Sequence, residues 1–581
     1  MNAPRVVALA VLLLAAHGAG AAQGGGQRPG QGQGMPARGG GLAAEDAPKG
    51  TATLRGVVIA ADTGSPVRRA QVRAFAPGVR GGRLATTDEQ GRFEIRELVA
   101  GRYTLTAGKG GFVSLQYGQR RPSEQGTPID VADDETIDKL VIALPRGSVL
   151  AGRITDEFGE PVTDAVVTAL RYGYVGGTRR ILPGGRGDTT DDRGEFRLFG
   201  LQPGDYYVSA AFRVRGGEVT DPAGESTGYA PTYYPGTSNV AEAQRVSVGV
   251  GQEMTSVSFA LVATRLVKVS GSVVSSQGVP GSGVVALTPA DGGTGLRMEM
   301  NAGRVDQAGQ FEIDNVAPGR YLLQTRAGMG GGGRGGGLRG GGEFGRMEIA
   351  VGNDDLRGVV IVTAPGARLA GRVVTDTGEP PSFPAQQAIV AAQSGDVSPN
   401  PFGGGIGGAG VNGDWTFELS NLFDPKYFRM RLPRGWTLDA VYLDGADVTD
   451  TPVTLPPGQA RGGLEIVISE KVSTLTGLVK DDRGNPVLDA TIVVFPDDEA
   501  LWMFQSRFIK AARPDQDGHY TIEGLPAHRA YLAVAVQGLE DGQAGDPDFL
   551  RSVASGAVRF GLGKGESKNV DIEIAAPRQR D

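Results

Sequence analysis

The stretch Asp88–Tyr103, with the sequence DEQGRFEIRELVAGRY, decides the fold of this chain. Its first four residues have turn chemistry, because Asp bonds its own backbone and Gly adopts a positive φ without steric cost. Phe93, Ile95 and Leu98 then share one side of a strand, and a second strand opens at Tyr103. The stretch therefore predicts a hairpin turn, a half-buried strand, a corner and a further strand.

This pattern returns four more times, at intervals of about a hundred residues, which indicates tandem domains rather than a solenoid of short repeats. In each copy a corner tyrosine follows the aromatic strand residue by ten or eleven positions. The corner resembles the tyrosine corner of immunoglobulin-like sandwiches, where the hydroxyl group bonds backbone a few residues upstream. The five expected structural corner residues are Tyr103, Tyr206, Tyr321, Tyr427 and Tyr531.

The spacing of these copies predicts an all-β chain of five tandem β-sandwich domains of the immunoglobulin-like or transthyretin-like kind. The linkers between copies are very short, so we expect an elongated, semi-rigid array. The predicted repeats, named first to fifth below, span residues 51–145, 146–264, 265–365, 366–470 and 471–577.

The N-terminal residues predict export. Residues 1–22 have the pattern of a signal peptide, with Arg5 before the apolar run Val6–Ala16. Residues 23–50 are rich in Gly, Gln and Pro, which is typical of a disordered linker. We expect a periplasmic or extracellular protein without a membrane span.

Composition narrows the function further. The chain has no cysteine, so packing rather than disulfides must stabilise an exported protein. The net charge of −7 over 581 residues gives no basic footprint for nucleic acid. Two Gly-rich insertions, at 327–346 and about 393–410, are expected to be disordered loops. The insertion Glu499–Arg513 is the best candidate for a short helix, which would cover a sheet edge.

Three motifs recur together: Gly-x-Pro-Val as at Gly64–Val67, Asp-x-x-Gly-x-Phe as at Asp88–Phe93, and Leu-x-Pro-Gly-x-Tyr as at Leu201–Tyr206. Together they resemble the carboxypeptidase regulatory-like domain, over nearly all of Thr51–Ala576. This resemblance implies a transthyretin-like sandwich, grouped with carbohydrate-binding-like folds. It also implies an accessory module, because the peptidase of such enzymes is a separate zinc domain.

No catalytic residue, metal site or cofactor is expected. After the signal peptide only His519 and His528 remain, and neither belongs to a zinc motif. Gly224–Gly228 fits the Gly-x-Ser-x-Gly pattern of hydrolases but has no nearby histidine, so loop composition explains it. Arg186–Asp188 is an adhesion-type triplet that chance explains in a chain with 94 glycines. The acidic turns are interpreted as hairpin chemistry rather than as calcium loops.

Two further hypotheses concern single repeats. In the fifth repeat, Lys480 and Asn569 could form an isopeptide crosslink with Glu523 as proton shuttle, as related adhesin sandwiches do. The favoured alternative is that Lys480 is an ordinary surface lysine after a strand. In the second repeat, the candidate ligand-binding residues are Tyr229, Tyr233 and Tyr234, whose rings could stack on sugar rings. Packing of their own loop is the favoured alternative.

The sequence therefore predicts an exported, non-catalytic protein that acts as spacer, scaffold or adhesive binding protein in the cell envelope. The alternative is a carbohydrate-binding protein that uses loop aromatics, and a remote one is an accessory subunit of a peptidase or other hydrolase. The expected partner is a polysaccharide or an envelope or extracellular protein. The oligomeric state is left open.

Overall fold

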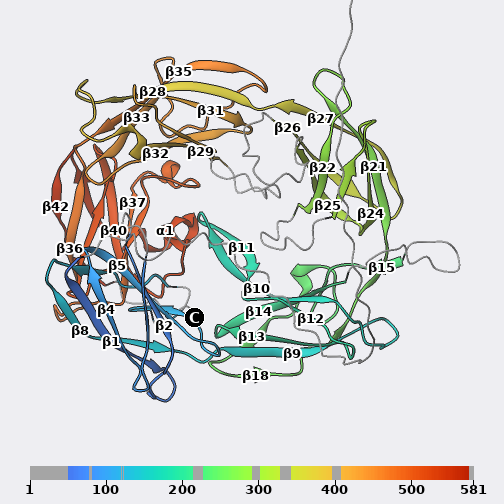
Figure 1. Ribbon diagram of the computed structural model, residues 1–581, viewed down its shortest axis with the longest axis horizontal. Helices are drawn as coiled ribbons and strands as arrows, with labels where there is room; N and C mark the ends of the chain where they lie inside the picture. Colours follow the sequence, from blue (N-terminus) through green and yellow to red (C-terminus); the bar gives the residue numbers. More distant parts are fainter. Residues whose placement is uncertain are drawn as a thin grey trace, which may run out of the picture. The chain divides into compact units, whose positions relative to one another are not determined.

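The computed structural model describes residues 50–76, 82–119, 121, 124–212, 227–290, 301–326, 342–395 and 407–574. These residues belong to one compact unit that spans Ala47–Asp581. Strands form nearly all of its regular structure, as predicted (Figure 1). The predicted signal peptide, the predicted linker up to residue 49, and most of both Gly-rich insertions lie outside the described residues.

The first repeat packs two sheets against each other. One has the strand order β4-β1-β8, and the other has β3-β2-β5-β6, with β7 also pairing with β5. Their bounds are β1 (Ala52–Ala60), β2 (Gln71–Phe75), β3 (Arg83–Thr86), β4 (Arg92–Leu98), β5 (Gly101–Gly108), β6 (Leu115–Gln116), β7 (Ile129–Val131) and β8 (Thr136–Leu144).

The predicted hairpin turn precedes β4. The side-chain Oδ1 of Asp88 accepts hydrogen bonds from the backbone N–H of Gln90 (2.9 Å) and of Arg92 (2.8 Å). Gly91 has a φ of 72°, which a residue with a Cβ seldom adopts. Asp191, Asp306 and Asp515 accept equivalent pairs of bonds in their own repeats. One carboxylate oxygen of each of these aspartates therefore serves the turn, as the sequence predicted.

A glycine in the opening strand of each repeat explains the small residue that recurs there. Strand β1 pairs antiparallel with β4 and parallel with β8, so it lies between them. A Cβ on Gly56 would lie 2.2 Å from the carbonyl oxygen of Leu140 in β8. The same clash, at 1.8–2.4 Å from a carbonyl oxygen of the closing segment, would occur at Gly152, Gly271, Gly371 and Gly477. Each position thus requires glycine for close strand approach.

The second repeat has the same plan. Its sheets are β13-β9-β18, with β19 also on β9, and β11-β10-β14-β16, with β12 on β10 and β17 on β14. Their bounds are β9 (Ser148–Thr155), β10 (Val166–Val175), β11 (Thr178–Pro183), β12 (Asp188–Thr189), β13 (Glu195–Leu201), β14 (Gly204–Ala211), β15 (Thr227–Tyr229), β16 (Thr232–Tyr233), β17 (Val246–Val248), β18 (Glu253–Met254) and β19 (Phe259–Ala260). A 3₁₀ turn spans Val240–Glu242, and β15 pairs with β20 (Ala263–Arg265), which crosses the predicted boundary to the third repeat.

The third repeat differs from an open sandwich, because its strands join into a closed barrel in the order β21-β24-β23-β22-β25-β26-β27. The bounds are β21 (Val267–Ser275), β22 (Gly283–Pro289), β23 (Asn301–Val305), β24 (Gln310–Val316), β25 (Gly319–Arg326), β26 (Glu343–Val351) and β27 (Leu356–Pro365). The two sheets meet where Val305 pairs with Phe311 and where β26 pairs with β27. Closure removes the exposed edges that an open sandwich leaves.

The fourth repeat has the sheets β31-β28-β35-β33-β34 and β30-β29-β32. The bounds are β28 (Ala367–Thr375), β29 (Ile389–Ser394), β30 (Gly407–Gly410), β31 (Thr416–Leu422), β32 (Lys426–Arg431), β33 (Thr437–Leu443), β34 (Ala446–Asp447) and β35 (Ala460–Ser469). A 3₁₀ turn spans Ala385–Gln387.

The fifth repeat has the sheets β39-β36-β42, with β43 also on β36, and β38-β37-β40-β41. The bounds are β36 (Thr474–Lys480), β37 (Ala490–Pro496), β38 (Lys510–Ala512), β39 (His519–Glu523), β40 (Arg529–Gln537), β41 (Val558–Leu562), β42 (Ser567–Asn569), β43 (Ile572–Glu573) and helix α1 (Pro547–Ala554). Further 3₁₀ turns span Glu499–Leu501 and Gln543–Gly545.

The expected helix in Glu499–Arg513 is wrong, because this segment forms only a 3₁₀ turn and strand β38. The α-helix lies at Pro547–Ala554, where Asp546 caps the N-terminus and proline occupies the first turn. Trp502 from the insertion and Leu550 from α1 join a second apolar cluster of this repeat. The insertion and the helix therefore help to cover the second face of a sheet rather than its edge.

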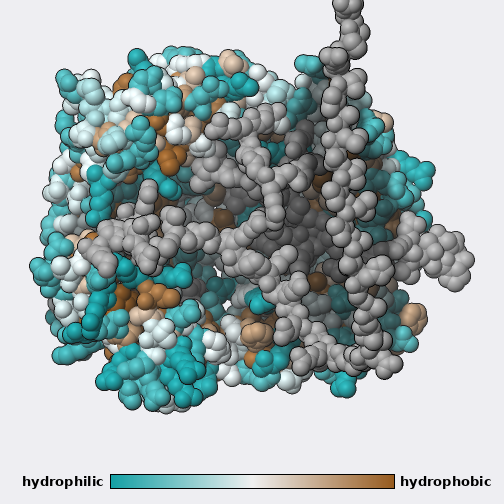
Figure 2. Space-filling model, in the orientation of Figure 1, coloured by the Kyte–Doolittle hydropathy of each residue, from teal (hydrophilic) through white to brown (hydrophobic). Residues whose placement is uncertain are grey.

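The hydrophobic cores follow the predicted repeats. The main buried clusters comprise residues within 52–144, 150–261, 267–361, 367–468 and 475–572, and none mixes two repeats. The limits of the domains themselves stay a prediction. On the face seen in Figure 2, hydrophobic and hydrophilic residues are interspersed over the described strands.

No helix among the described residues is long and apolar enough to cross a lipid bilayer.

Candidate functional site

Four of the five corner tyrosines donate a hydrogen bond to a carbonyl oxygen shortly upstream. The acceptors are Val99 for Tyr103 (3.0 Å), Gln202 for Tyr206 (2.7 Å), Ala317 for Tyr321 (2.8 Å) and Pro526 for Tyr531 (2.7 Å). Burial raises the pKa of the Tyr206 hydroxyl group, so it stays a proton donor.

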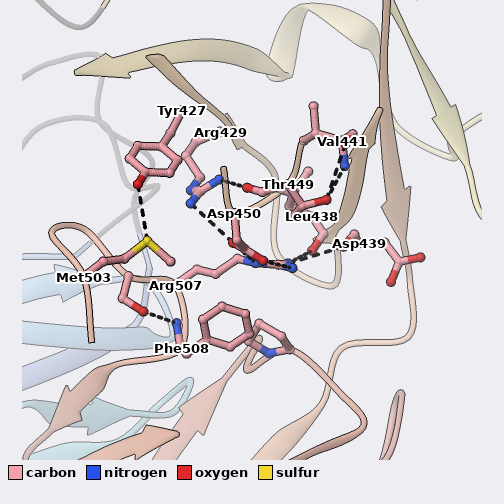
Figure 3. Close-up of polar contacts among 12 residues, drawn as sticks. Tyr427, Arg429, Leu438, Asp439, Val441, Thr449, Asp450, Met503, Arg507 and Phe508 are labelled. Atoms are coloured by element: carbon pink, nitrogen blue, oxygen red, sulfur yellow. Dashed lines mark hydrogen bonds and ion pairs between the residues drawn. The ribbon is translucent and has the colours of Figure 1, made fainter. Parts of the chain in front are cut away.

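Tyr427 differs from the expected corner. Its hydroxyl group lies 3.3 Å from the sulfur of Met503, a residue of the fifth repeat (Figure 3). The fourth copy has Pro425 where the first and third copies have the corner glycine, and Asp424 before it has a φ of 61°. Tyr427 therefore takes part in a contact between two repeats.

Two of the three candidate ligand-binding tyrosines pack on their own repeat. Tyr229 donates a hydrogen bond of 2.9 Å to Glu157 and lies edge-on to Phe212. Burial and this carboxylate raise the pKa of Tyr229. Tyr234 lies edge-on to Phe259 and packs against the core. Neither ring is arranged as a sugar platform.

Tyr233 lies elsewhere, on the wall of a cavity of about 720 Å³ between the second and third repeats. Strand β16 positions it by pairing Tyr233 with Ser209 of β14. The loop that follows is tight, since the Tyr233 N–H bonds the carbonyl of Thr237 at 2.7 Å. Thr232 ties this loop to the closing segment of the same repeat by accepting the N–H of Val262 at 3.0 Å. The structure thus places one of the three tyrosines at a cavity.

A second wall of this cavity is the hairpin β10–β11. Val175 pairs with Thr178, which leaves Gly176 and Gly177 as a two-residue turn with φ values of 56° and 81°. In the hairpin, the guanidinium carbon of Arg179 lies 4.3 Å from the centre of the Tyr172 ring. Such a cation–π contact holds the arginine side chain in place.

Figure 3 shows a charged junction between the fourth and fifth repeats. Arg507 of the fifth repeat binds both oxygens of Asp450 in the fourth, at 2.8 and 2.9 Å. Arg429 lies 3.6 Å from the same carboxylate and donates to the carbonyl of Thr449 at 2.6 Å. These three side chains are only 14–20% exposed. Burial lowers the pKa of Arg429, and Asp450 opposes this shift.

A lysine extends this junction. Lys564 of the fifth repeat contacts Asp376 at 2.9 Å and Asp439 at 2.8 Å, both in the fourth repeat. Burial acts to raise the pKa of Asp376, but the hydrogen bonds from Lys564 and Ser469 outweigh it and lower the pKa. Burial likewise opposes the rise in the pKa of Lys564 that the two carboxylates produce. Both groups are therefore held in their charged forms.

The fifth repeat also contacts the first two. Arg513 is 2% exposed and donates to the carbonyl of Gln125 at 2.6 Å, with the Glu124 carboxylate 3.9 Å away. A Cβ on Gly177 would lie 2.0 Å from the carbonyl oxygen of Gly545, so the β10–β11 turn closely approaches the fifth repeat. The order of repeats along the chain did not predict these contacts. The expected elongated array is wrong, because the fifth repeat contacts the first two within one compact unit.

The remaining candidate residues form no reactive group. His519 is exposed on β39, and His528 lies in a turn with a φ of 60°. Lys480 pairs in register with Glu573 and contacts Asp571, whereas Asn569 pairs with Thr476, four residues away from Lys480. Lys480 and Asn569 are thus not positioned for a crosslink. The described residues include no group of three or more His, Cys, Asp or Glu side chains that could hold a metal ion.

Sequence reasoning missed the arginines that form the contacts between repeats and line the cavity. Arg507 and Arg513 lie in the insertion 499–513. The length of this insertion and its basic residues were the only local features that could have indicated a contact surface. Arg179 and Tyr172 flank a Gly-Gly dipeptide, which is a hairpin signal. Their partners are distant in sequence, so no local pattern could reveal them.

Comparison with known proteins identifies the family that the first repeat resembles. Residues 53–143 match the family model of the carboxypeptidase regulatory-like domain. A search of curated proteins found no match. Among solved structures, a streptococcal ancillary pilin is 14% identical, covering 54% of this chain and 98% of the pilin at a TM-score of 0.19. The minor pilin of Streptococcus agalactiae is 14% identical (36% and 95% covered, TM-score 0.20), and the shaft pilin of Lactobacillus rhamnosus is 10% identical (37% and 98%, TM-score 0.18).

TM-scores this low carry no argument about function. The family match covers the hairpin turn at Asp88, the strand with Phe93 and the corner at Tyr103, which are the features that the sequence predicted. Residues 53–143 of the first repeat are therefore a carboxypeptidase regulatory-like domain.

Proposed function

We propose that this chain is an exported, non-catalytic scaffold of β-sandwich repeats that acts as a spacer or adhesive binding protein in the cell envelope or outside it. The observation that carries this proposal is the buried junction in which Arg507 and Arg429 surround Asp450 (Figure 3). Removing one partner from a buried ion pair costs about 3–5 kcal/mol, because the other charge stays buried and unpaired. A junction of this kind resists bending between repeats.

Resistance to bending is what a scaffold needs. Ion pairs on the strands are mostly exposed, as between Arg372 and Glu465, and such pairs contribute little. The buried charges are concentrated where repeats meet, at Asp450 and at Arg513. This distribution supports a protein whose function depends on the relative position of its repeats.

The chain lacks cysteine, so two introduced cysteines can carry spin labels without interference. Glu418→Cys on β31 and Ser567→Cys on β42 are exposed positions on the two sides of the junction. We expect a narrow distribution of label distances that Asp450→Asn broadens. The control Asp444→Asn removes an equal charge from an exposed pair with Arg461 and should leave the distribution unchanged. A broad distribution in the unmodified junction, or no effect of Asp450→Asn, contradicts the scaffold.

Export and partner binding need a cellular test. Fractionation of the native cells should place the protein in the periplasm or outside, and crosslinking there should join it to an envelope or extracellular component. Recovery in the cytoplasm, or the absence of any crosslinked component, would contradict the proposal.

A further inference from the structure

The cavity between the second and third repeats has a one-sided charge. Arg179, Arg180 and Arg320 are among the described residues that line it, and none of these described residues is Asp or Glu. Within the described residues neither Arg179 nor Arg180 forms an ion pair, and Arg320 makes only an exposed contact of 3.7 Å with Glu348. The chain as a whole is acidic, with a net charge of −7. The described part of the wall thus carries three arginines and no carboxylate, a local feature that favours an anionic ligand.

Aromatic rings and prolines form the apolar part of the same wall. Tyr172, Tyr233 and Tyr321 come from three different strands, and Pro231 and Pro318 come from the turns between strands. Tyr172 is 38% exposed even with Arg179 above its ring. Rings of this kind offer C–H and π surface to the apolar face of a flat ligand.

Neutral hydrogen-bonding side chains surround the cavity from separate segments. Thr178, Ser238, Asn239, Thr264 and Asn353 all line it. Hydroxyl and amide groups both donate and accept hydrogen bonds, which suits a ligand with many hydroxyl groups. An extended peptide would instead form backbone hydrogen bonds along the edge of a sheet. The edge strand at this cavity is β11, which is only six residues long and ends at Pro183, so it offers a peptide few such bonds.

We propose that this cavity binds a short oligosaccharide that carries carboxylate groups, such as a segment of a polyuronic acid. An arginine guanidinium recognises a carboxylate with two parallel hydrogen bonds, the tyrosines contact the sugar rings, and the threonine, serine and asparagine side chains bond the hydroxyl groups. The volume of about 720 Å³ lies within the range of about 300–1,000 Å³ that is usual for ligand cavities. This inference goes beyond the scaffold role and does not depend on it.

Isothermal titration of the full chain tests the proposal directly. The probes are trimers of galacturonate, glucuronate, mannuronate and guluronate, each compared with its methyl ester, which keeps the rings and hydroxyl groups but removes the charge. We expect at least one acidic trimer to bind, and its methyl ester to bind at least about tenfold more weakly, because the ester cannot form the charged bidentate contact. Raising the salt concentration should weaken binding of the acid.

Two variants locate the binding to the cavity. Arg180→Gln and Tyr233→Ala should each weaken binding of the acidic trimer about tenfold or more. The matched control Arg197→Gln removes an exposed arginine of β13 that lies outside the cavity and pairs with Glu253, so binding should be unchanged. Hydrogen exchange with mass spectrometry on each variant shows whether the second repeat has kept its fold. Arg320→Gln, on the third repeat, provides an independent variant if Tyr233→Ala unfolds.

Three results would overturn the inference: no acidic trimer binds at about 1 mM, the folded Arg180→Gln and Arg320→Gln variants bind as the unmodified chain does, or a hexaglutamate peptide binds more tightly than every trimer. The last result would assign the cavity to acidic peptides. The spin-label distances across the Asp450 junction do not involve this cavity, so failure of glycan binding and failure of the scaffold role are distinguishable.

Discussion

Replacing Gly477 by alanine should destabilise the fifth repeat. Gly477 lies in β36, between β39 and the closing strands β42 and β43. A Cβ there would lie 2.0 Å from the carbonyl oxygen of Val570 and 2.9 Å from the ring of Tyr520. Since Cβ contacts below 3.0 Å essentially never occur, the closing strand must move by about 1 Å.

The magnitude follows from three contributions. Overpacking a tight site costs about 1–3 kcal/mol. The displaced carbonyl of Val570 also accepts the Tyr520 hydroxyl group at 2.6 Å, and loss of this hydrogen bond costs about 1 kcal/mol. Alanine restricts the unfolded chain, which offsets about 0.5–1 kcal/mol. We therefore expect the free energy of unfolding of this repeat to fall by about 1–3 kcal/mol.

Hydrogen exchange with mass spectrometry on the full chain measures this loss, because it reports each repeat separately where a single unfolding curve would not. Amides of β36 and β39 should exchange about 5- to 150-fold faster through global opening of the repeat. The matched control is Gly561→Ala on β41 of the same repeat, where a new Cβ would have its nearest neighbour, the carbonyl oxygen of Arg529, at 4.0 Å. Equal exchange in the two variants would falsify the close-approach argument.

Two further predictions test the corner and the charged junction. Tyr206→Phe should destabilise the second repeat by about 1 kcal/mol, since its hydroxyl donates to Gln202, whereas Tyr427→Phe should cost the fourth repeat less, because sulfur is a weak acceptor; equal costs in hydrogen exchange would contradict this reasoning. The Asp376–Lys564 contact should stabilise the junction between about pH 5 and pH 10. The lowered pKa of Asp376 means that this contribution is lost as the pH falls through its folded value, and the raised pKa of Lys564 means that it is lost as the pH rises through its own. Distances between spin labels at Glu418→Cys and Ser567→Cys should broaden at both extremes. Asp376→Asn should weaken the acid response, which Asp439 and Asp450 also contribute to; an unchanged acid response in that variant would refute the assignment.

Sequence by itself determined the local structure. The Asp turn, the aromatic strand residue, the glycine of the opening strand and four of the corner tyrosines act through neighbours a few residues away or through strand pairing that recurs in every copy, so a repeated pattern reveals them. The sequence alone also showed that the chain has no cysteine and no zinc-binding motif. These features sufficed for the all-β class and for the family of the first repeat.

Tertiary structure alone decided what lies between repeats. Asp450 and Arg507 are 57 residues apart, and Arg513 meets Gln125 across 388 residues. The third repeat closes into a barrel through strand pairs such as Val305 with Phe311. A turn pattern in the sequence does not show that such a pair will join two sheets. The cavity with its three arginines takes one wall from each of two repeats. Contacts of this kind depend on surfaces that come together only after each repeat has folded, and such surfaces carry no periodic signal in the sequence.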